Sequence, residues 1–539
     1  MHQTLLLCLA LMLAVTLLVM VGQRLRIPVP IFLVLSGLAV SLVPGIPPIE
    51  VDPELIFLIF LPPLLYEAAW FMSWKEFWRW RRIIVVLAFG LVLFTSFAVA
   101  YVSSAVIPGF TLALGFLLGG IISPPDAVAA TSVLKEVNIS KAAISILEGE
   151  SLVNDAASLV VFRFALAAVL SGSFAWQVAS VDFLLVTIMG IVVGLAVGGV
   201  FYAIHRWMPT TTRISILLTF IAPYIMYMTA EEFKVSGVMA VVSGGLFLSN
   251  QSHVILNHSS RIQGTGMWAT VVFALNGLVF ILIGLELPVI INGLEGYSKT
   301  EAVLFALLIT AVVIVTRMVF TVSSSYFTQF IGKYITVAQR NPGWRGPFII
   351  GWAGMRGVVS LASALSVPLA LQNGTPFPHR NLILFITFVV ILVTLVFQGL
   401  TLPLVIRWIN PKDLDVRIPE DEQETRIRLK LLKVALAYLH ENYAKESSTN
   451  ELVENLKNRM ESDLHQTKRH LDSLESDGDN VTKYNEIVTD IINVKREELH
   501  RLRSVQEFDD EVIRKEEAQM DLEEEKLITR FVKRIVFDR

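Results

Sequence analysis

Apolar residues follow one another in long runs over the first three quarters of this chain, and polar residues gather between the runs. A helix that crosses a bilayer needs about 20 mostly apolar residues, because the hydrocarbon core is about 30 Å thick. Thirteen runs come close to that length or exceed it. The pattern therefore predicts an all-α polytopic membrane protein with about 13 transmembrane helices, at residues 4–21, 28–43, 54–72, 83–107, 110–134, 144–170, 182–204, 213–231, 235–249, 267–291, 301–328, 347–371 and 381–409.

The charges between these runs predict the orientation. When the loops are taken alternately, fourteen Lys and Arg residues fall in one set and only Lys234, Lys299 and Arg380 in the other. Loops rich in Lys and Arg stay on the cytoplasmic side of a membrane. We therefore expect the N-terminus outside and the C-terminus in the cytoplasm of a multi-pass protein of the plasma (inner) membrane. The first run lacks a preceding basic residue and a small-residue cleavage pattern, so we expect it to be a retained helix and not a cleaved signal.

Composition agrees with a membrane protein and excludes several other classes. Hydrophobic residues make up 54% of the 539 residues and charged residues 17%, with a mean hydropathy of +0.62. These values lie outside the range of soluble proteins. The single cysteine, Cys8, excludes an internal disulfide framework and a cysteine-clustered metal site. No GxxxxGK[ST] loop for ATP is present, and we expect no cofactor and no nucleic-acid partner.

The composition changes sharply near Pro411. Residues 411–539 hold 23 Lys and Arg against 31 Asp and Glu, whereas residues 1–410 hold all the apolar runs. We interpret the first part as a transmembrane domain and the second as a cytoplasmic tail. Apolar residues at spacings of three and four predict amphipathic, coiled-coil-like helices over 451–475 and 485–506, joined by a turn at 476–478. A solvated helical hairpin and a regulatory or dimer-stabilising domain both fit this pattern.

Two of the predicted helices carry residues that break helices. The fifth contains Pro124 and Pro125 side by side, and neither can donate a backbone hydrogen bond. The twelfth contains Gly354 and Gly357 on either side of Arg356. Broken backbone at membrane depth is tolerated only where it is buried in protein or lines a watery cavity. Paired interrupted helices in two halves of a chain indicate the central site of a transporter.

The sixth run is unusually polar for a membrane helix. The sequence GESLVNDAA, from Gly149 to Ala157, places Glu150, Ser151, Asn154 and Asp155 within two turns. Each ionised group at the centre of a spanning helix costs about 2.5 to 3.5 kcal/mol, so such groups are usually functional. Residues four apart share a helix face, which puts Ser151 with Asp155 and Glu150 with Asn154 on neighbouring faces.

These two faces suggest two roles. Asp155 and Ser151, together with Asp126 from the broken fifth helix, would offer the hard oxygen ligands of a small monovalent cation such as Na⁺. Glu150 would neutralise Arg356 from the broken twelfth helix, because an unpaired buried charge is costly. The alternative is that these groups are only polar contacts between helices. Two further arginines, Arg163 and Arg317, lie within predicted spans and either pair with carboxylates or extend toward an interface.

The order and spacing of five motifs resemble those of a known family. They are FLPPLLYE (60–67), SPPDAV (123–128), GESLVNDA (149–156), GLELP (284–288) and GMRG (354–357). The chain is similar over residues 1–410 to the sodium/proton exchangers of the monovalent cation:proton antiporter superfamily, in its electroneutral branch. The resemblance implies an inverted-repeat antiporter fold with two broken crossing helices, usually in a homodimer. The tail lies outside it.

The resemblance also implies roles for individual residues. Asp155 would bind cation and proton alternately, with Asn154 beside it where electrogenic relatives have a second aspartate. The other residues that match family positions are Asp126 and Ser151 at the cation site, Glu67 as a nearby carboxylate, and the ion pair of Glu150 with Arg356. One position departs from the family: Pro125 stands where a threonine is common, so a side-chain hydroxyl is missing there.

These features together predict a secondary antiporter that exchanges Na⁺, with Li⁺ and K⁺ as alternatives, for H⁺ and so regulates pH. Cation and proton would compete for Asp155, and a site open alternately to each side would need no ATP. Membrane lipids and a second copy of the chain are the expected partners. A cation channel and a transport-inactive ion or pH sensor are the alternatives. A membrane enzyme is disfavoured, because Ser151 has no nearby histidine in the sequence.

Overall fold

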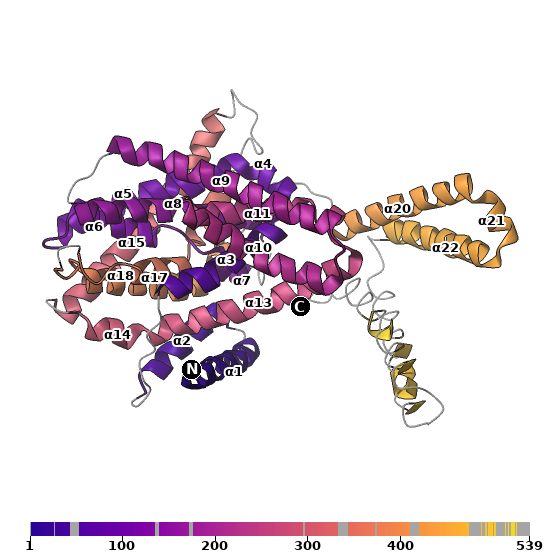
Figure 1. The fold of residues 1–539 in the computed structure, drawn as a ribbon, viewed down its shortest axis with the longest axis horizontal. Helices are drawn as coiled ribbons and strands as arrows, with labels where there is room; N and C mark the ends of the chain where they lie inside the picture. The colour runs from indigo at the N-terminus through magenta and orange to yellow at the C-terminus, as the bar shows by residue number, and fades with distance from the viewer. Residues whose placement is uncertain are drawn as a thin grey trace. The chain divides into compact units, whose positions relative to one another are not determined.

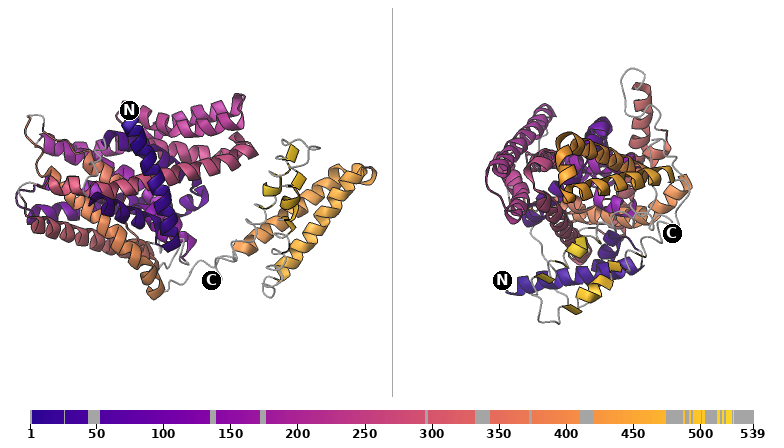
Figure 2. Two further views of the ribbon diagram at one scale, coloured as in Figure 1. Left: turned by 90° about the horizontal axis from the view of Figure 1, so that it is seen from below. Right: turned by 90° about the vertical axis from the view of Figure 1, so that its right-hand side faces the viewer.

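The computed structural model describes residues 2–25, 27–43, 53–134, 139–171, 176–294, 297–331, 343–371, 374–409 and 420–473, and some residues between 487 and 524. The described parts are almost entirely helical, with a single isolated β-bridge between Ala370 and Pro376. The chain divides into two compact units, Met1–Leu414 and Asp415–Arg539. Figures 1 and 2 show the long helices of the first unit running side by side.

Most helices of the first unit overlap the predicted apolar runs, although several extend beyond them and residues 74–82 and 252–255 are helical outside any run. In chain order they are α1 (His2–Leu25), α2 (Val29–Ser41), α3 (Pro53–Phe71), α4 (Trp74–Val85), the π-helical η1 (Val86–Leu91), α5 (Val92–Val106), α6 (Leu112–Ile122), α7 (Ala127–Leu134), α8 (Lys141–Ser171), α9 (Trp176–Trp207), α10 (Thr212–Glu232), α11 (Gly237–Asn250), α12 (Ser252–Ile255), α13 (His258–Leu285), α14 (Leu287–Asn292), α15 (Lys299–Ile331), α16 (Arg345–Trp352), α17 (Val358–Leu365), α18 (Arg380–Val393), the π-helical η2 (Thr394–Gln398) and α19 (Gly399–Ile409).

Length and composition make this unit a membrane protein. Eight helical segments of the described chain are long and apolar enough to cross a bilayer, and four shorter apolar helices lie among them. Each of the thirteen predicted ranges contains helix, and the range 347–371 contains the two short helices α16 and α17. The prediction of an all-α polytopic membrane fold is therefore confirmed, while the number of crossings stays a prediction.

The helices pack into two groups. One group contains α5, α6, α8, α15, α16, α17 and α18, and the other contains α1, α2, α3, α9, α10, α11 and α13. Within the second group, Gly194 of α9 lies against Ala240 of α11 so closely that a Cβ at Gly194 would overlap the Ala240 backbone. Small residues let membrane helices approach in this way. Gly190 and Gly198 of α9 likewise lie against Ser236, Met239, Gly244 and Phe247, so this row of glycines packs within the chain.

A histidine joins three loops at one end of the first unit. The His379 Nδ1 lies 2.7 Å from the Tyr297 hydroxyl, and Nε2 lies 3.2 Å from the Gly109 carbonyl oxygen. Partial burial raises the pKa of Tyr297, so its hydroxyl stays protonated and can donate to Nδ1. His379 adopts the left-handed conformation with φ of +54°. These contacts hold together the loops that precede α6, α15 and α18.

The second unit begins with a helical hairpin. Its described helices are α20 (Glu420–Asn442), α21 (Ala444–Thr449) and α22 (Glu451–Ser473), and α20 packs against α22. The helix predicted over 451–475 is present as α22. Its described partner is α20, which lies before it in the chain. The predicted turn at 476–478 lies outside the described residues, as does half of the predicted helix at 485–506, and the residues of that range that are described are helical.

Candidate functional site at two broken helices

Two interrupted helices meet in the middle of the first unit. The segment between α6 and α7 covers residues 123–126, and the segment between α16 and α17 covers 353–357. The backbone N–H of Asp126 donates to the Met355 carbonyl at 2.7 Å, which joins one break directly to the other. Pro124 and Pro125 have no N–H to continue the first helix, and the second breaks within a glycine-rich stretch. The prediction of two broken helices is confirmed, and the breaks lie against each other.

Asp126 lies where two short helices begin. Its Oδ1 accepts a hydrogen bond from the Val128 N–H at 2.8 Å, and the backbone N–H groups of Ala129 and Val358 also donate to this carboxylate. Val128 and Ala129 are in the first turn of α7, and Val358 is the first residue of α17. Helix N-termini carry partial positive charge and unpaired N–H groups. The carboxylate is therefore stabilised by both breaks.

The polar face of α8 is held against the same break. The Ala127 N–H donates to the Ser151 hydroxyl at 3.2 Å, and the Asn154 side-chain amide donates to the Pro125 carbonyl at 3.2 Å. Asn154 is fully buried, and its Oδ1 has no hydrogen-bond partner among the described residues. A buried polar oxygen without a partner is costly unless it has a role. At position 125 the break thus offers a backbone carbonyl, which Asn154 binds, and no side-chain hydroxyl.

Asp155 lies one residue further along α8. Only 7% of its surface is exposed, and it is close enough to Asp126 for the two charges to interact. Within the described part of the chain, no side chain donates a hydrogen bond to its carboxylate. Two carboxylates that share a buried region repel each other, and a cation between them or a proton on one of them removes the repulsion. Such a site can hold a cation or a proton.

The ion pair of Glu150 differs from the predicted one. Glu150 is fully buried and binds Arg317 of α15 in a bidentate arrangement, with Nη1 to Oε1 at 2.6 Å and Nη2 to Oε2 at 2.9 Å. Arg317 Nη2 also donates to the Ile350 carbonyl at 3.2 Å. The predicted pairing of Glu150 with Arg356 is therefore wrong, since two parallel hydrogen bonds already fix the carboxylate on Arg317.

Arg356 instead binds carbonyl groups that the breaks leave free. Its Nε donates to the Ile122 carbonyl at 3.0 Å, and its Nη1 donates to the Gly354 carbonyl. Ile122 is the last residue of α6, so the guanidinium lies at the negative end of that helix. The backbone N–H of Arg356 donates to the Thr394 hydroxyl at 3.2 Å. Arg356 thus makes no direct contact with a carboxylate of the described residues, although it lies within electrostatic range of Glu150.

A signal for the Arg317 pairing is present in the sequence. Arg317 is the only charged residue between Glu301 and Lys333. A lone guanidinium in the middle of an apolar helix needs a carboxylate partner. The polar run of α8 has two carboxylates, and because Asp155 was assigned to the cation, Glu150 was the one available to Arg317. Gly354 packs directly against the Arg317 side chain, and a Cβ at position 354 would overlap it.

The remaining predicted residue is Glu67. It lies half-buried on α3, which packs against α8 and α17. The contacts given above bring together Asp126, Ser151 and Asn154, and place Asp155 within electrostatic range of Asp126. They do not include Glu67, whose role at the site stays a prediction.

Comparisons with known proteins agree with this geometry. Residues 10–408 match the family described as sodium/hydrogen exchanger, transmembrane. An uncharacterized Na⁺/H⁺ exchanger of Mycobacterium tuberculosis is 32% identical over 531 residues, which cover 96% of this chain and 95% of that protein. The sodium, potassium, lithium and rubidium/H⁺ antiporter of Bacillus pumilus is 33% identical over 77% of this chain and 62% of its own length. The sodium proton antiporter MjNhaP1 of Methanocaldococcus jannaschii shares the fold, with a TM-score of 0.60 at 18% identity over 76% of this chain and 99% of that one.

Proposed function

The chain belongs to the family of transmembrane sodium/hydrogen exchangers, and from this premise we propose that Asp155 binds the sodium ion and the proton in turn. The protein exchanges Na⁺ for H⁺ across a membrane. The observation that supports the proposed site is the meeting of two broken helices beside a buried aspartate. There Asp126, Ser151 and Asn154 are joined to the breaks by hydrogen bonds, and Asp155 lies within reach of the Asp126 charge.

In the proposed site the cation is held by oxygen atoms alone. Asp155 and Asp126 supply negative charge, the Ser151 hydroxyl supplies a neutral oxygen, and the unpartnered Oδ1 of Asn154 supplies another. Carboxylate, hydroxyl and amide oxygens are the ligands that hard cations prefer. Na⁺ is the transported substrate here. Glu67 on α3 is the further carboxylate that would attract it.

The neutral side chain of Asn154 is the basis for proposing electroneutral exchange. If Asp155 carries one cation in one direction and one proton in the other, and the neighbouring residue never ionises, no net charge crosses in a cycle. Alternating access would come from movement of one helix group against the other. The ion pair of Arg163 on α8 with Glu231 on α10, 2.7 Å long, joins the two groups in the present conformation.

We further propose a homodimer in the plasma membrane, with the N-terminus outside and the tail in the cytoplasm, where it regulates exchange. The loop charges favour this orientation. The face of α9 that does not pack on α11 exposes large apolar side chains to lipid or to a second copy. They are Leu184, Leu185, Ile188, Met189, Val192, Leu195 and Val200.

Ion flux in proteoliposomes tests the proposed exchange. Purified protein is reconstituted with a pH-sensitive dye inside, and Na⁺, Li⁺ or K⁺ is added outside. For Na⁺ and Li⁺, valinomycin and a K⁺ gradient set the membrane voltage; when K⁺ is the added cation, valinomycin is omitted. We expect Na⁺ to drive proton movement at a rate that does not depend on voltage. A rate that follows voltage would contradict electroneutrality and favour electrogenic exchange or a channel, and the absence of any response from folded protein would favour a sensor.

Gly357→Ala is expected to reduce exchange strongly by displacing Asp126. A Cβ at position 357 would overlap the Asp126 carboxylate, so that side chain must move away from the helix N-termini that hold it. Overpacking of this kind costs about 1–3 kcal/mol, and we expect the initial Na⁺/H⁺ exchange rate to fall about tenfold or more. Gly346→Ala is the matched control, because a Cβ there meets no atom within 4 Å. Equal rates for the two variants would contradict the role given to Gly357.

A further inference from the structure

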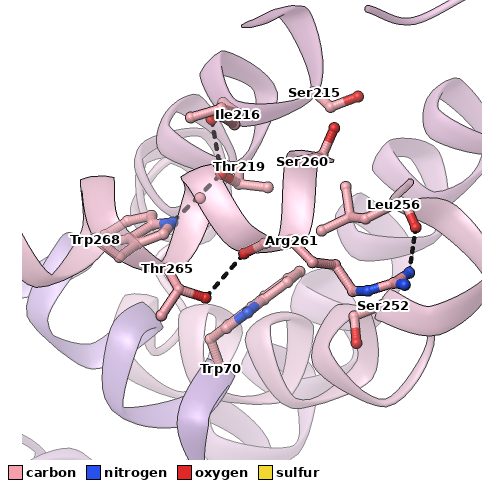
Figure 3. A pocket seen from close by; sticks show the side chains of 11 residues that line it. Trp70, Ser215, Ile216, Thr219, Ser252, Leu256, Ser260, Arg261, Thr265 and Trp268 are labelled. Atoms are coloured by element: carbon pink, nitrogen blue, oxygen red, sulfur yellow. Dashed lines mark hydrogen bonds between the residues drawn. The ribbon is translucent and has the colours of Figure 1, made fainter. Parts of the chain in front are cut away.

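A cavity of about 110 Å³ lies apart from the Asp155 site, between the end of α3, the start of α10, α12 and the start of α13 (Figure 3). None of the residues that form the Asp155 site line it. Its polar and aromatic lining comes mainly from Trp70, Ser215, Ser252, Ser260, Arg261 and Trp268. The helices that surround it begin or end there, so the cavity lies at the level where membrane helices reach the interface. Tryptophans are common at that level.

The lining carries positive charge. Arg261 is the only ionised residue among those that line the cavity, and no Asp or Glu is among them. The Arg261 Nη1 donates to the Leu256 carbonyl at 2.6 Å, which fixes the guanidinium at the cavity and leaves its other N–H groups for a ligand. The charge of the lining therefore favours an anion over a cation.

Hydroxyl groups also line the cavity. Ser260 is 1% exposed, and its Oγ has no hydrogen-bond partner among the described residues. Figure 3 shows Ser215, Ser252, Ser260 and Arg261 on one side of the cavity and Trp268 on the other. Ser260 also belongs to the first turn of α13, at the positive end of that helix. A buried hydroxyl without a partner, in a cavity that an arginine also lines, is a ready donor to an acceptor-rich ligand.

From this arrangement we propose that the cavity binds a phosphate group. A phosphate offers several strong acceptor oxygens with negative charge, which match one guanidinium and the neighbouring hydroxyls. The volume holds one such group and little more. The phosphate comes either from the headgroup of an anionic phospholipid or from a free phosphate ion, and both have this chemistry.

Occupation of the cavity would brace α3 against α13. The rings of Tyr66 and Trp70 on α3 are 5.6 Å apart, and Tyr66 lies 5.3 Å from Trp268 on α13. The Trp268 Nε1 donates to the Thr219 hydroxyl on α10 at 3.3 Å. A ligand in the cavity therefore contacts residues of α3, α10 and α13 at once. Because it binds only the folded arrangement, it raises the temperature of unfolding.

Thermal unfolding of the full-length protein in a neutral detergent tests the proposal. The midpoint is measured with increasing sodium phosphate and, separately, with short-chain phosphatidylglycerol. Sodium chloride at equal ionic strength and short-chain phosphatidylcholine are the ligand controls. We expect a saturable rise in the midpoint. A rise with phosphatidylglycerol alone assigns the ligand to lipid, and a rise with inorganic phosphate assigns it to the free ion. The same small rise with all four additions would overturn the proposal.

Variants decide whether the effect arises at this cavity. Arg261→Gln removes the charge, and the apparent Kd for the effective ligand is expected to weaken about tenfold or more. Arg213→Gln is its control, since Arg213 is exposed on α10 and does not line the cavity. Gly264→Leu fills the cavity, because a Cβ there lies 3.9 Å from Ile216, another lining residue.

Gly266→Leu is the control for the filled cavity, since a Cβ at Gly266 meets nothing within 4 Å on the same helix. Leucine also favours helix more than glycine does, so both leucine variants are expected to fold. Wild-type affinity in both Arg261→Gln and Gly264→Leu would overturn the assignment of the phosphate to this cavity. If Arg261→Gln fails to fold, Gly264→Leu against Gly266→Leu still decides the question.

Discussion

Replacement of Asp155 by Asn is expected to abolish Na⁺/H⁺ exchange, lowering the initial rate about 100-fold or more while the protein stays folded. The amide keeps the size of the side chain but can neither lose a proton nor carry the negative charge that binds a cation. Removing one partner of a buried charge interaction costs about 3–5 kcal/mol, which is more than a factor of 100 in binding. Stability should not fall, because the neutral amide would no longer repel the nearby Asp126 charge.

The measurement is the proteoliposome dye assay, with the thermal unfolding midpoint as the test of folding. Asp182→Asn is the matched control: the same substitution in another membrane helix, at a half-buried residue of α9 that has no part in the site. We expect Asp182→Asn to exchange at the wild-type rate. If Asp155→Asn retained that rate as well, the cation and proton would have to bind elsewhere, and the roles proposed for Asp126 and Ser151 would fail with it.

The sequence was sufficient to predict the main features of this region because their causes are local. Pro124 and Pro125 have no N–H to donate and therefore favour a break, although the pair Pro62 and Pro63 lies inside the continuous helix α3. The glycines around Arg356 act in a similar way. The polar run on α8 was recognisable because polar groups in an apolar helix are costly and need partners. Paired broken helices are typical of transporters, so we expected the two breaks to lie at one site. In the structure, the backbone hydrogen bond from Asp126 to Met355 joins them.

The partners of charged residues could not be predicted with the same success. Several arginines within the predicted spans were candidate partners of Glu150, and spacing along the chain does not say which helices become neighbours. Arg356 was chosen because it lies at a break, but a break also exposes carbonyl groups, and the Ile122 and Gly354 carbonyls satisfy it. In the tail, too, the sequence did not predict which helices pack against each other. The periodicity of α22 was clear, but its described partner is the earlier helix α20.

The Glu150 and Arg317 pair gives the second large expected effect. Arg317→Met is expected to destabilise the protein by about 3–5 kcal/mol, because it leaves the Glu150 carboxylate buried without its partner. Glu150→Gln should also destabilise it, since the Arg317 guanidinium then lacks a counter-charge. In the double variant both charges are gone, and the loss of stability should be much smaller than the sum of the single losses. The free energy of unfolding is measured by titration with a denaturing detergent.

A second cycle, with Glu150→Gln and Arg356→Met, separates this pair from the one that the sequence suggested. Arg356 donates to the carbonyls of Ile122 and Gly354, so its loss should cost stability whether or not Glu150 is charged. A double-mutant cycle measures the coupling of two residues, which is large for a direct ion pair and smaller for Glu150 and Arg356, because these two interact through their charges without a direct contact. We expect a coupling of about 2–3 kcal/mol for Glu150 with Arg317 and below about 1 kcal/mol for Glu150 with Arg356. The reverse order would mean that Glu150 exchanges its arginine partner in a conformation that is more populated in the membrane than the one described.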